Sequence, residues 1–435
     1  MTTVTAGKSV PVDKQGDLSG EERVHRAMAQ FAKDFGCTAA IYMESCVHCG
    51  ECAEACHFYV ATKDPKYTPI WKLEPFKRAY KRESSPFSLF YRLFNLEKAV
   101  TVDQLEQWQE YIYGSCTQCG RCTMVCPMGI DIAALVGQAR HAMFHAGLAP
   151  QGLLQKAEKE AREGGLMGTV EEVRKKLESI AAKHGIKLPI DRDQADVMLT
   201  VSSIEIPSYP DALAYAAKVF EHMGISWTIR MDGYECTNLP MVSGNLGWQK
   251  DMTLKVINAA VACKAKTVII PECGHAYTAL RWSGANMYGK ALPFEVKHMS
   301  EFLADAVASG GLRVKQVGRS VTFHDPCQVS RRGGATRAPR TVLNALGVEL
   351  VEMESTGDLN WCCGGGGGVL AIPSASALRH AAFKIKMQQV DATGADQLVT
   401  TCANCRKMFD EGRAHFNWNR TADSLLQLVA ENLAA

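Results

Sequence analysis

The pattern of apolar and polar positions divides the chain into two parts. In the N-terminal part, apolar residues recur at three- and four-residue steps, as in DIAALVGQARHAMFHA (131–146), which is typical of helices. The charged stretch TVEEVRKKLESIAAKH (169–184) predicts a further helix that ends at Gly185. We expect this helix to lead into a region where short β-rich runs alternate with helices.

That alternation occurs twice after residue 196. In the first half, we expect strands at 197–204, 225–231 and 267–276, and helices at 211–224 and 249–264. In the second half, we expect strands at 321–327, 348–353 and 397–405, and helices at 339–347 and 375–393. Strand–helix alternation with short connections predicts a parallel, Rossmann-like sheet in each half, and the shared order indicates an internal duplication.

These patterns together predict an α/β chain with an N-terminal α-helical, ferredoxin-like domain and two duplicated α/β halves. The expected boundaries are a polar tail at 1–19, the helical domain at 20–165, a helical linker at 166–195, and the halves at 196–315 and 316–435.

The composition narrows the class of protein. The 435 residues are 47% hydrophobic and 22% charged, which excludes disordered and fibrous chains. A net charge of +2 gives no strong positive potential of the kind that attracts nucleic acid, so a nucleic-acid-binding protein is not expected. The first twenty-odd residues lack the apolar core of a signal peptide, and no run of ~20 apolar residues follows. We therefore expect a cytoplasmic protein, with any membrane contact peripheral and made through a partner at the cytoplasmic face of the inner membrane.

Cysteine is the unusual residue, because thirteen of the 17 cysteines fall into three tight arrays. Such arrays indicate metal sites with reduced thiolates rather than the disulfides of a short secreted scaffold. The first two arrays share the spacing C-x2-C-x2-C-x3-C: they are Cys46, Cys49, Cys52 and Cys56, then Cys116, Cys119, Cys122 and Cys126. Pro127 completes the bacterial ferredoxin pattern, whereas His57 stands at the equivalent place in the first array.

In that pattern, three cysteines of one loop and the fourth cysteine of the other array hold one four-iron cube. We assign Cys46, Cys49, Cys52 and Cys126 to one cubane [4Fe-4S] cluster, and Cys116, Cys119, Cys122 and Cys56 to a second. Zinc is the alternative, but zinc takes four ligands in separated pairs. Paired cubanes predict a path for electrons, because the iron–sulfur core carries the redox chemistry.

The insert 63–98 between these arrays holds eight aromatic residues, and nine basic against four acidic side chains. A basic, aromatic surface suits a membrane interface or the cytoplasmic face of a membrane subunit. The alternative is that these helices wrap the clusters and bury their aromatic rings.

The third array has five cysteines, Cys327, Cys362, Cys363, Cys402 and Cys405. A four-iron cube needs four thiolates, so the fifth permits an unusual cluster geometry or a site that opens toward a thiol. The glycines Gly364, Gly365, Gly366, Gly367 and Gly368 follow directly and allow close backbone approach, with amide groups free to face sulfides. A vicinal disulfide and a zinc site are the alternatives to a cluster.

Three stretches of the second half, HDPCQVSR (324–331), NWCCGGGGG (360–368) and TTCANC (400–405), resemble the CCG motif of the heterodisulfide reductase family. YECTNLPMVSG (234–244) and IPECGHAY (270–277) resemble the degenerate first repeat of its membrane-linked branch, together with SPFSLFYRLF and CTQCGRCTMVCPMGID (116–131) upstream. That branch fuses ferredoxin and CCG domains, so the resemblance extends over nearly the whole chain from about residue 35.

The resemblance implies that the five cysteines bind a catalytic [4Fe-4S] cluster, noncubane in relatives, which reduces or forms a disulfide in two one-electron steps. It also implies two kinds of partner, a membrane cytochrome b or quinone-reactive subunit and a small thiol/disulfide protein or cofactor. A second interpretation is a subunit that only relays electrons from a flavoprotein, such as an acyl-CoA, glycolate or glycerol-phosphate dehydrogenase, to quinone. The pentaglycine run and the single complete CCG motif favour the first interpretation.

The first half lacks most of these ligands. Ser202 or Ser203 falls where the second half has Cys327, and Glu235–Cys236 falls where it has Cys362–Cys363. Only Cys236 and Cys273 remain as thiols there, so a retained pocket wall is favoured over a further cluster.

Four polar positions at strand ends are candidates for proton transfer. Glu272 and His275 lie at a predicted strand's carboxyl end, where they could donate a proton to a leaving thiolate or simply form a turn. His324 and Asp325 have a similar claim, with a strand-end hydrogen bond as the alternative. Cys37 and Cys263 are expected to be free or buried thiols.

Overall fold

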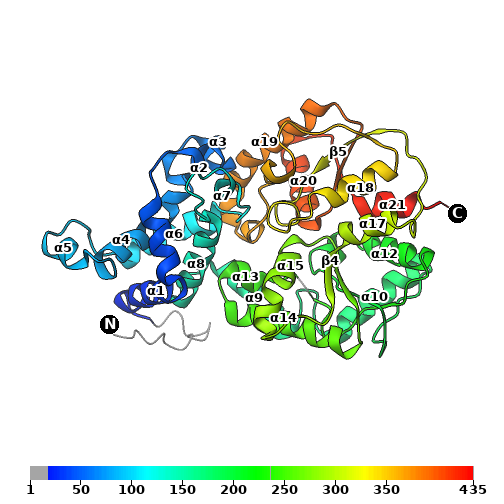
Figure 1. Cartoon of the computed structure of the whole chain (residues 1–435), viewed down its shortest axis with the longest axis horizontal. Coiled ribbons are helices and arrows are strands. Elements are labelled where there is room, and N and C mark those ends of the chain that lie inside the picture. Colours follow the sequence, from blue (N-terminus) through cyan, green and yellow to red (C-terminus); the bar gives the residue numbers. More distant parts are fainter. Residues whose placement is uncertain (1–17, 236, 435) are drawn as a thin grey trace. The chain divides into compact units, whose positions relative to one another are not determined.

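The computed structural model describes residues 18–235 and 237–434, which form two compact units (Figure 1). The first unit combines Met1–Gln155 with two later segments, Pro240–Leu246 and Gly366–Ala382, and the second holds the remainder. The sequence pattern does not reveal that these later segments belong to the helical unit. Residues 1–17 of the expected polar tail, and Cys236, lie outside the described residues.

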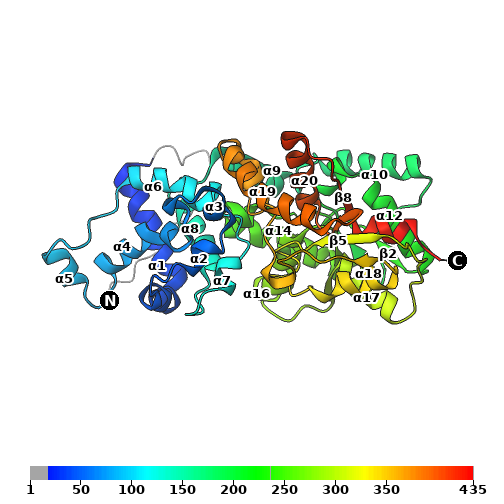
Figure 2. The same ribbon diagram turned by 90° about the horizontal axis from the view of Figure 1, so that it is seen from above.

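The first unit is helical. Its helices, drawn mainly in blue and cyan in Figures 1 and 2, are α1 (Gly20–Ser45), α2 (Glu51–Glu54), α3 (His57–Thr62), α4 (Glu74–Glu83), α5 (Ser88–Leu93), α6 (Val102–Gln109), α7 (Arg121–Met124) and α8 (Ile132–His145), with short turns η2 (Pro65–Tyr67), η3 (Ile70–Leu73) and η4 (Glu110–Gly114). α1 packs on α8. The later segments add η7 (Val369–Ala371) and η8 (Pro373–Ala375).

Capping side chains explain where several helices begin. The Ser19 hydroxyl accepts a hydrogen bond from the amide of Glu22 at the start of α1, and Asp131 accepts one from Ala134 at the start of α8. The helix expected at 131–146 is confirmed as α8, and the helix at 169–184 is confirmed as α10 (Val170–His184). α10 ends at Gly185, whose φ of +62° is the left-handed conformation that a helix C-terminus favours.

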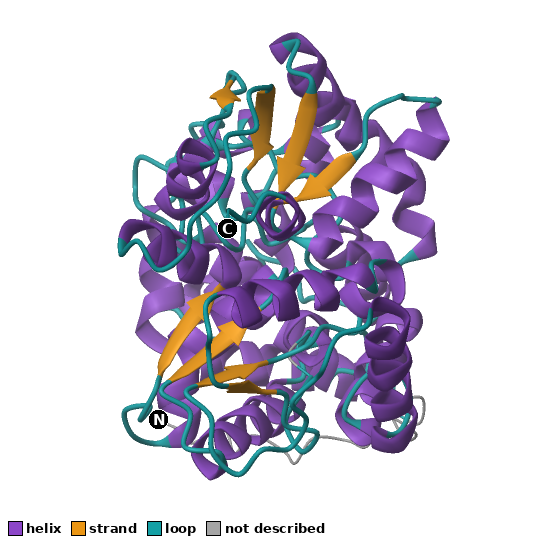
Figure 3. Cartoon of the chain, turned by 90° about the vertical axis from the view of Figure 1, so that its right-hand side faces the viewer, coloured by secondary structure: helices purple, strands orange, loops and turns teal. Residues whose placement is uncertain are grey.

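The second unit contains two four-stranded sheets in which every neighbouring pair of strands is parallel. The first sheet has the order β2 (Trp227–Thr228), β1 (Val197–Leu199), β3 (Thr267–Ile270), β4 (Glu295–His298), and the second has the order β6 (Glu349–Leu350), β5 (Ser320–His324), β7 (Gln397–Thr400), β8 (Ala422–Ser424). The strands appear in orange in Figure 3. The fold is therefore mixed α/β, and the two sheets share one strand order.

Helices surround these sheets. They are α11 (Glu205–Ser208), α12 (Asp211–His222), α14 (Leu246–Ala262), α15 (Gly274–Thr278), η5 (Ala279–Ser283), α16 (Gly284–Tyr288), α17 (Met299–Ala308), α18 (Arg337–Ala345), η6 (Gly357–Leu359), α20 (Ala403–Phe416) and α21 (Leu425–Glu431). The division into units falls within four helices: α14, which begins in the first unit at Leu246, and α9 (Gln151–Glu163), α13 (Leu239–Ser243) and α19 (Ser376–Thr393).

One apolar core of the second unit lies across both sheets. It includes Leu199 and Ile269 of the first sheet and Phe323 and Val399 of the second, all at most 2% exposed. Because β5 and β7 are parallel neighbours, their carboxyl ends lie at one edge of the sheet. The chain continues from those ends to Cys327 and Cys402, which places two of the five cysteines at that edge.

Candidate metal centres

The structure brings the first eight array cysteines together in two groups of four. One pocket of the helical unit is lined by Cys46, Cys49, Cys52 and Cys126. A second pocket is lined by Cys56, Cys116, Cys119 and Cys122. Each group takes three thiols from one loop and the fourth from the other array, as the spacing predicts.

The two cysteine loops have matching backbone conformations. His48 and Gln118 stand at equivalent positions, and both have a φ of +54°, in the left-handed region. Gly50 and Gly120 follow in the same region, with φ of +87° and +77°, and directly precede α2 and α7. Left-handed residues beside a short helix turn successive amide groups inward, which suits an anionic metal–sulfur centre.

The surroundings of the two loops differ. Val47, His48 and Cys49 of the first loop are exposed, whereas Ser115 and Thr117 of the second loop are buried. The first group of thiols is therefore the one that lies nearer to solvent within this unit.

Two buried cations lie beside the second group. The Lys72 side chain is buried, and its ammonium donates a hydrogen bond to the carbonyl oxygen of Ser115. Burial raises the pKa of the Cys56 thiol, and the positive charge of Lys72 opposes that rise. A cation here favours the thiolate form that a metal requires.

Arg140 is the second of these cations and is completely buried. Its guanidinium donates, over 2.6–3.4 Å, to the backbone carbonyl oxygens of Ile112, Tyr113, Cys116, Val242 and Gly367. Those acceptors belong to all three chain segments of the helical unit. Arg140 therefore joins the second cysteine loop to the two segments that arrive from later in the chain.

The third group of thiols lies in the second unit and is buried throughout. The Sγ atoms of Cys327 and Cys362 are 3.9 Å apart, and those of Cys363 and Cys405 are 3.3 Å apart. Both separations exceed the length of a disulfide bond, so neither pair is joined by one. Cys402 is the N-cap of α20 and Cys405 lies in its first turn, so both sit at the positive end of that helix.

Local hydrogen bonds divide the thiols of this group. The contacts of Cys363 with Cys362 and Cys405 hold the pKa of Cys363 well below its usual range, and the contacts of Cys405 with Cys363 and Cys402 raise the pKa of Cys405. A hydrogen bond with Cys405 likewise lowers the pKa of Cys402, to which the amide of Gly274 also donates.

The glycine run 364–368 is divided between the two units, with Gly364 and Gly365 in the second unit and the other three glycines in the helical unit. The amide of Gly364 donates to Cys362 Sγ at 3.4 Å, so its first member contacts the thiols of the second unit. Gly367 belongs to the helical unit and has a φ of +60°, and a Cβ atom there would lie 2.7–2.8 Å from backbone atoms of Thr117. Only glycine fits so close to the second cysteine loop.

His324, at the end of β5, is the other ligand-type side chain in this group. One of its ring nitrogens and the Sγ atoms of Cys363 and Cys405 all lie within 4.8 Å of one another. The ring is 1% exposed, and within the described residues neither nitrogen has a hydrogen-bond partner. Burial, with the nearby charge of Lys386, holds the pKa of His324 well below its usual range. The strand-end hydrogen bond considered for His324 is therefore not present.

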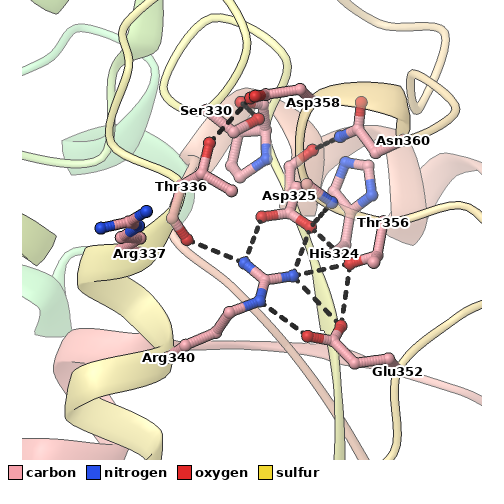
Figure 4. A network of polar contacts seen from close by, with 12 residues as sticks. His324, Asp325, Ser330, Thr336, Arg337, Arg340, Glu352, Thr356, Asp358 and Asn360 are labelled. Carbon is pink, nitrogen blue, oxygen red and sulfur yellow. Dashed lines mark hydrogen bonds and ion pairs between the residues drawn. The ribbon is translucent and has the colours of Figure 1, made fainter.

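Asp325 turns away into a polar network that Figure 4 shows. Its carboxylate oxygens accept hydrogen bonds from both terminal nitrogens of Arg340 at 2.9 Å and from the amide of Gly357 at 2.7 Å. These bonds, chiefly those of Arg340, outweigh burial and lower the pKa of Asp325. Asp325 thus fixes the loop after η6, which carries Cys362 and Cys363.

The candidate proton donors lie on the first sheet's side of the second unit. Glu272 is 1% exposed, accepts a hydrogen bond from Ser424, and has Arg406 at 3.5 Å from Oε2. The backbone oxygen of Glu272 accepts a hydrogen bond from the amide of Ala403, the residue after Cys402. Burial raises the pKa of Glu272. His275 lies half-buried on α15.

The positions in the first half that correspond to the five cysteines form a hydrogen-bonded network instead. Ser203 donates to Glu235, and the amide of Thr237 donates to the same carboxylate at 2.7 Å. Burial raises the pKa of Cys273, in contrast to Cys363 and Cys402. Among the described residues here, carboxylate and hydroxyl groups have taken the places of thiols, as a retained pocket wall requires.

Several buried ionisable residues escape the sequence analysis. They are Lys72, Arg140, Glu160, Glu205 and Lys386. Burial and the charge of Glu272 raise the pKa of Glu205 to about 8. Arg140 carries a sequence signal, since it stands within the otherwise apolar helix 131–146; the others read as ordinary surface residues in their local sequence.

The chemistry of the donor sets fits iron–sulfur clusters. Each set consists of cysteine thiols on backbone that places amide groups or helix N-termini toward them, and buried cations lie near the second and third sets. Cubanes would be held by the two groups of four, and a further cluster by Cys327, Cys362, Cys363, Cys402 and Cys405.

Comparison with known proteins agrees with these sites. Residues 42–130 match the 4Fe-4S dicluster domain, and residues 321–410 match the cysteine-rich domain named CCG. In the dihydromethanophenazine:CoB–CoM heterodisulfide reductase of Methanosarcina barkeri, the D subunit is 28% identical to this chain, over 90% of this chain and 94% of its own length.

Two further relatives cover most of this chain. Hdr-like menaquinol oxidoreductase iron-sulfur subunit 2 of Archaeoglobus fulgidus is 24% identical over 85% of this chain and 76% of its own length. The EtfAB:quinone oxidoreductase of Syntrophomonas wolfei is 27% identical over 87% of this chain and 56% of its own length. The chain thus carries matches to a 4Fe-4S dicluster domain and a CCG domain, and over most of its length it is similar to iron–sulfur subunits of heterodisulfide reductase and Hdr-like oxidoreductases.

Proposed function

We propose that this chain is the iron–sulfur subunit of a redox complex in which a disulfide is reduced or formed at the five-cysteine site. The observation that carries the proposal is a buried group of five cysteines, two of which, Cys363 and Cys405, meet His324, in a chain that also holds two four-thiol sets. The proposed cofactors are two cubane [4Fe-4S] clusters and a third, noncubane [4Fe-4S] cluster.

The chain's own residues prepare the third site for this chemistry. A bound cluster supplies single electrons and an open iron position for a substrate sulfur. Around it, Cys363 and Cys402 favour their thiolate forms, the glycine amides face the sulfurs, and burial excludes water. The proposal keeps Glu272 and His275 as donors of the proton that a leaving thiolate needs.

We infer an order for the electron path from the helical unit. The first cysteine loop is exposed, so a redox partner can approach the first cubane there. The second loop is buried and contacts Gly367, and the same glycine run begins beside Cys363 in the chain. This arrangement supports a path from the first cubane through the second to the five-cysteine site, in either direction.

The insert 63–98 supports a membrane partner, either a cytochrome b or a quinone-reactive subunit. Tyr67 and Phe76 are buried, so part of the insert belongs to the core. In contrast, six large apolar side chains on and around α5 are each more than half exposed: Phe87, Leu89, Phe90, Leu93, Phe94 and Leu96. We call these six residues the α5 patch and propose that it docks on the membrane subunit.

We further propose that the two sheets descend from duplicated CCG halves, of which the second alone retains a complete ligand set. Their identical strand order supports this origin. The network of Ser203, Glu235 and Thr237 supports a first half that has become a structural wall.

An electron relay between a flavoprotein and quinone remains the second candidate. The similarity to the EtfAB:quinone oxidoreductase of Syntrophomonas wolfei favours it, because that relative's name joins a flavoprotein and quinone. In this case the five-cysteine cluster would pass electrons without binding a thiol.

Electron paramagnetic resonance of the anaerobic, oxidised protein distinguishes the two functions. On addition of candidate thiols, we expect a new paramagnetic signal that Cys363→Ser abolishes and that Cys37→Ser, a change of an exposed thiol outside the arrays, leaves intact. Absence of any thiol-dependent signal, with all three clusters present, would contradict the disulfide chemistry and favour the relay.

A further inference from the structure

We propose that the buried ammonium of Lys386 raises the reduction potential of the five-cysteine cluster. The inference rests on the proposed function, because it assumes a cluster at that site. It adds a residue outside the ligand motif that determines how readily the site accepts an electron.

Lys386 is held inside the second unit by neutral groups. It lies on α19 and is 1% exposed. Its Nζ donates to Oε1 of Gln389 at 2.8 Å and lies 3.4 Å from Sδ of Met353. Within the described part of the chain, Lys386 forms no ion pair with a carboxylate.

A buried ammonium without a carboxylate partner is costly unless another anion compensates it. Packing places this part of α19 beside the five-cysteine site. The ring of Phe383, one turn before Lys386, lies 5.4 Å from that of Phe409, and Phe409 lies 5.2 Å from the ring of His324 (centroid distances). The groups whose charge acts on Lys386 are Asp325 and Cys362, Cys363 and Cys405. The charge of Asp325 is already offset by its two hydrogen bonds to Arg340, which leaves the cysteine site as the anionic centre that Lys386 can stabilise.

The protonation of Lys386 and of its neighbour agrees with this role. Burial lowers the pKa of Lys386 to about 8, against the opposing effect of Asp325 and the thiols, so the amine is still mostly charged at pH 7. The same charge helps to keep His324 neutral. The site thus has the interior cation Lys386 beside a neutral imidazole.

The physical effect follows from charge. Each electron added to a thiolate-bound cluster increases its negative charge, and a fixed cation in a low-dielectric interior stabilises the more negative state. Removing that cation should lower the midpoint potential of this cluster and of no other. Since Lys72 and Arg140 lie beside the second cubane, the cubanes provide internal references in the same molecule.

The test is a redox titration of the anaerobic, cluster-loaded full chain, followed by electron paramagnetic resonance. Lys386→Met removes the charge and keeps a similar side-chain length. Gln389→Glu replaces the amide that contacts the ammonium of Lys386 with a carboxylate. The new negative charge offsets the positive charge of Lys386, while the lysine side chain itself stays in place. Lys384→Met is the matched control, because Lys384 is exposed on the same helix.

In both test variants, we expect the ratio of reduced to oxidised third cluster at a fixed applied potential to fall on the order of tenfold. The cubane midpoints, and all midpoints of Lys384→Met, should match the wild type. An unchanged third midpoint in both test variants overturns the role of Lys386. If Lys386→Met loads only the cubanes, Gln389→Glu decides the question by itself.

If the proposed function is wrong because the third site holds no cluster, the wild-type protein itself would show the cubane signals and no third signal. If a third signal is present but its midpoint potential is the same in the wild type and in the Lys386 and Gln389 variants, the proposed function stands and only the inference about Lys386 is contradicted.

Discussion

At the scale of single residues, the interior cations are the feature that distinguishes this protein from an ordinary α/β chain. Lys72, Arg140 and Lys386 are each at most 2% exposed, and within the described residues none forms an ion pair with a carboxylate. Each interacts instead with the thiols of a cysteine set. Such positions were not predictable from the sequence, because lysine and arginine in a helix are usually solvated.

His298 provides a prediction at this scale. Burial lowers its pKa from 6.5 to about 3, so the folded protein keeps the ring neutral while the unfolded chain protonates it. The stabilisation is therefore complete above the unfolded pKa and is lost as the pH falls below it. Between pH 7.5 and pH 5.5, this residue should cost about 1.4 kcal/mol of stability.

The variant His298→Asn removes the titration but keeps an N-cap acceptor for Ser300 at the start of α17. In melts at matched pH, the wild type should lose more stability than this variant on acidification. His222→Asn, on the exposed face of α12, should behave as the wild type. Parallel curves for wild type and His298→Asn would contradict the assignment.

At the scale of elements, the expected helices and six of the eight strands were predicted. The stretches 211–224, 249–264, 339–347 and 375–393 are confirmed as α12, α14, α18 and α19. The edge strands β4 and β8, EVKH and ADS, were not predicted, because they lack a run of β-branched or aromatic residues. The insert 63–98 divides, with Phe76 in the core and the α5 patch exposed.

The candidate sites show a similar division between what spacing reveals and what it cannot. Motif spacing predicts which cysteines meet, since three thiols of a tight loop can reach one centre. Spacing does not reveal that Gly367 packs against the backbone of Thr117, or that Arg140 donates a hydrogen bond to the carbonyl oxygen of Gly367. Both contacts join chain segments more than 220 residues apart.

Gly367 gives a prediction at the element scale. In Gly367→Ala, the new Cβ would meet the Thr117 backbone at 2.7–2.8 Å, so the second cysteine loop must shift. We expect a changed spectrum or partial loss of the second cubane, and a destabilisation of roughly 1–3 kcal/mol.

Gly394→Ala is the matched control for this change. Gly394 has nearly the same φ, +63° against +60°, but nothing lies within 4 Å of its added Cβ. The backbone strain is thus common to both variants, and the difference between them measures the contact with Thr117. Equal stability and identical cubane spectra for the two would show that this contact does not matter.

At the scale of the whole molecule, a net charge of +2 conceals a local surface of different character. None of the helices in the described ranges, 18–235 and 237–434, has the length and apolarity that crossing a bilayer requires. The α5 patch is nevertheless strongly apolar, and basic side chains such as Arg78 and Arg92 belong to the same insert. A surface of this kind suits a partner embedded in the membrane.

The corresponding prediction is a triple replacement, Phe87→Ser, Phe90→Ser and Phe94→Ser. It should release most of the protein from native membranes, because it removes the large apolar area of the α5 patch, while iron content stays at the wild-type level. The amount of protein in membrane and supernatant fractions measures the effect.

The control variant changes three exposed apolar residues of the second unit, Val261, Trp282 and Leu359, to serine. It should remain with the membranes. Equal retention of the two triple variants would mean that the α5 patch is not the docking surface.

The discontinuous helical unit has a consequence for biosynthesis. Its cysteine loops are complete by residue 126, but the segments Pro240–Leu246 and Gly366–Ala382 that complete the unit leave the ribosome much later. Two of the five carbonyl partners of Arg140 are synthesised later than Arg140 itself: Val242 follows it by 102 residues and Gly367 by 227. A nascent chain would present its ferredoxin thiols unsupported for most of its synthesis, so cluster insertion into the second loop should be a late, post-translational event.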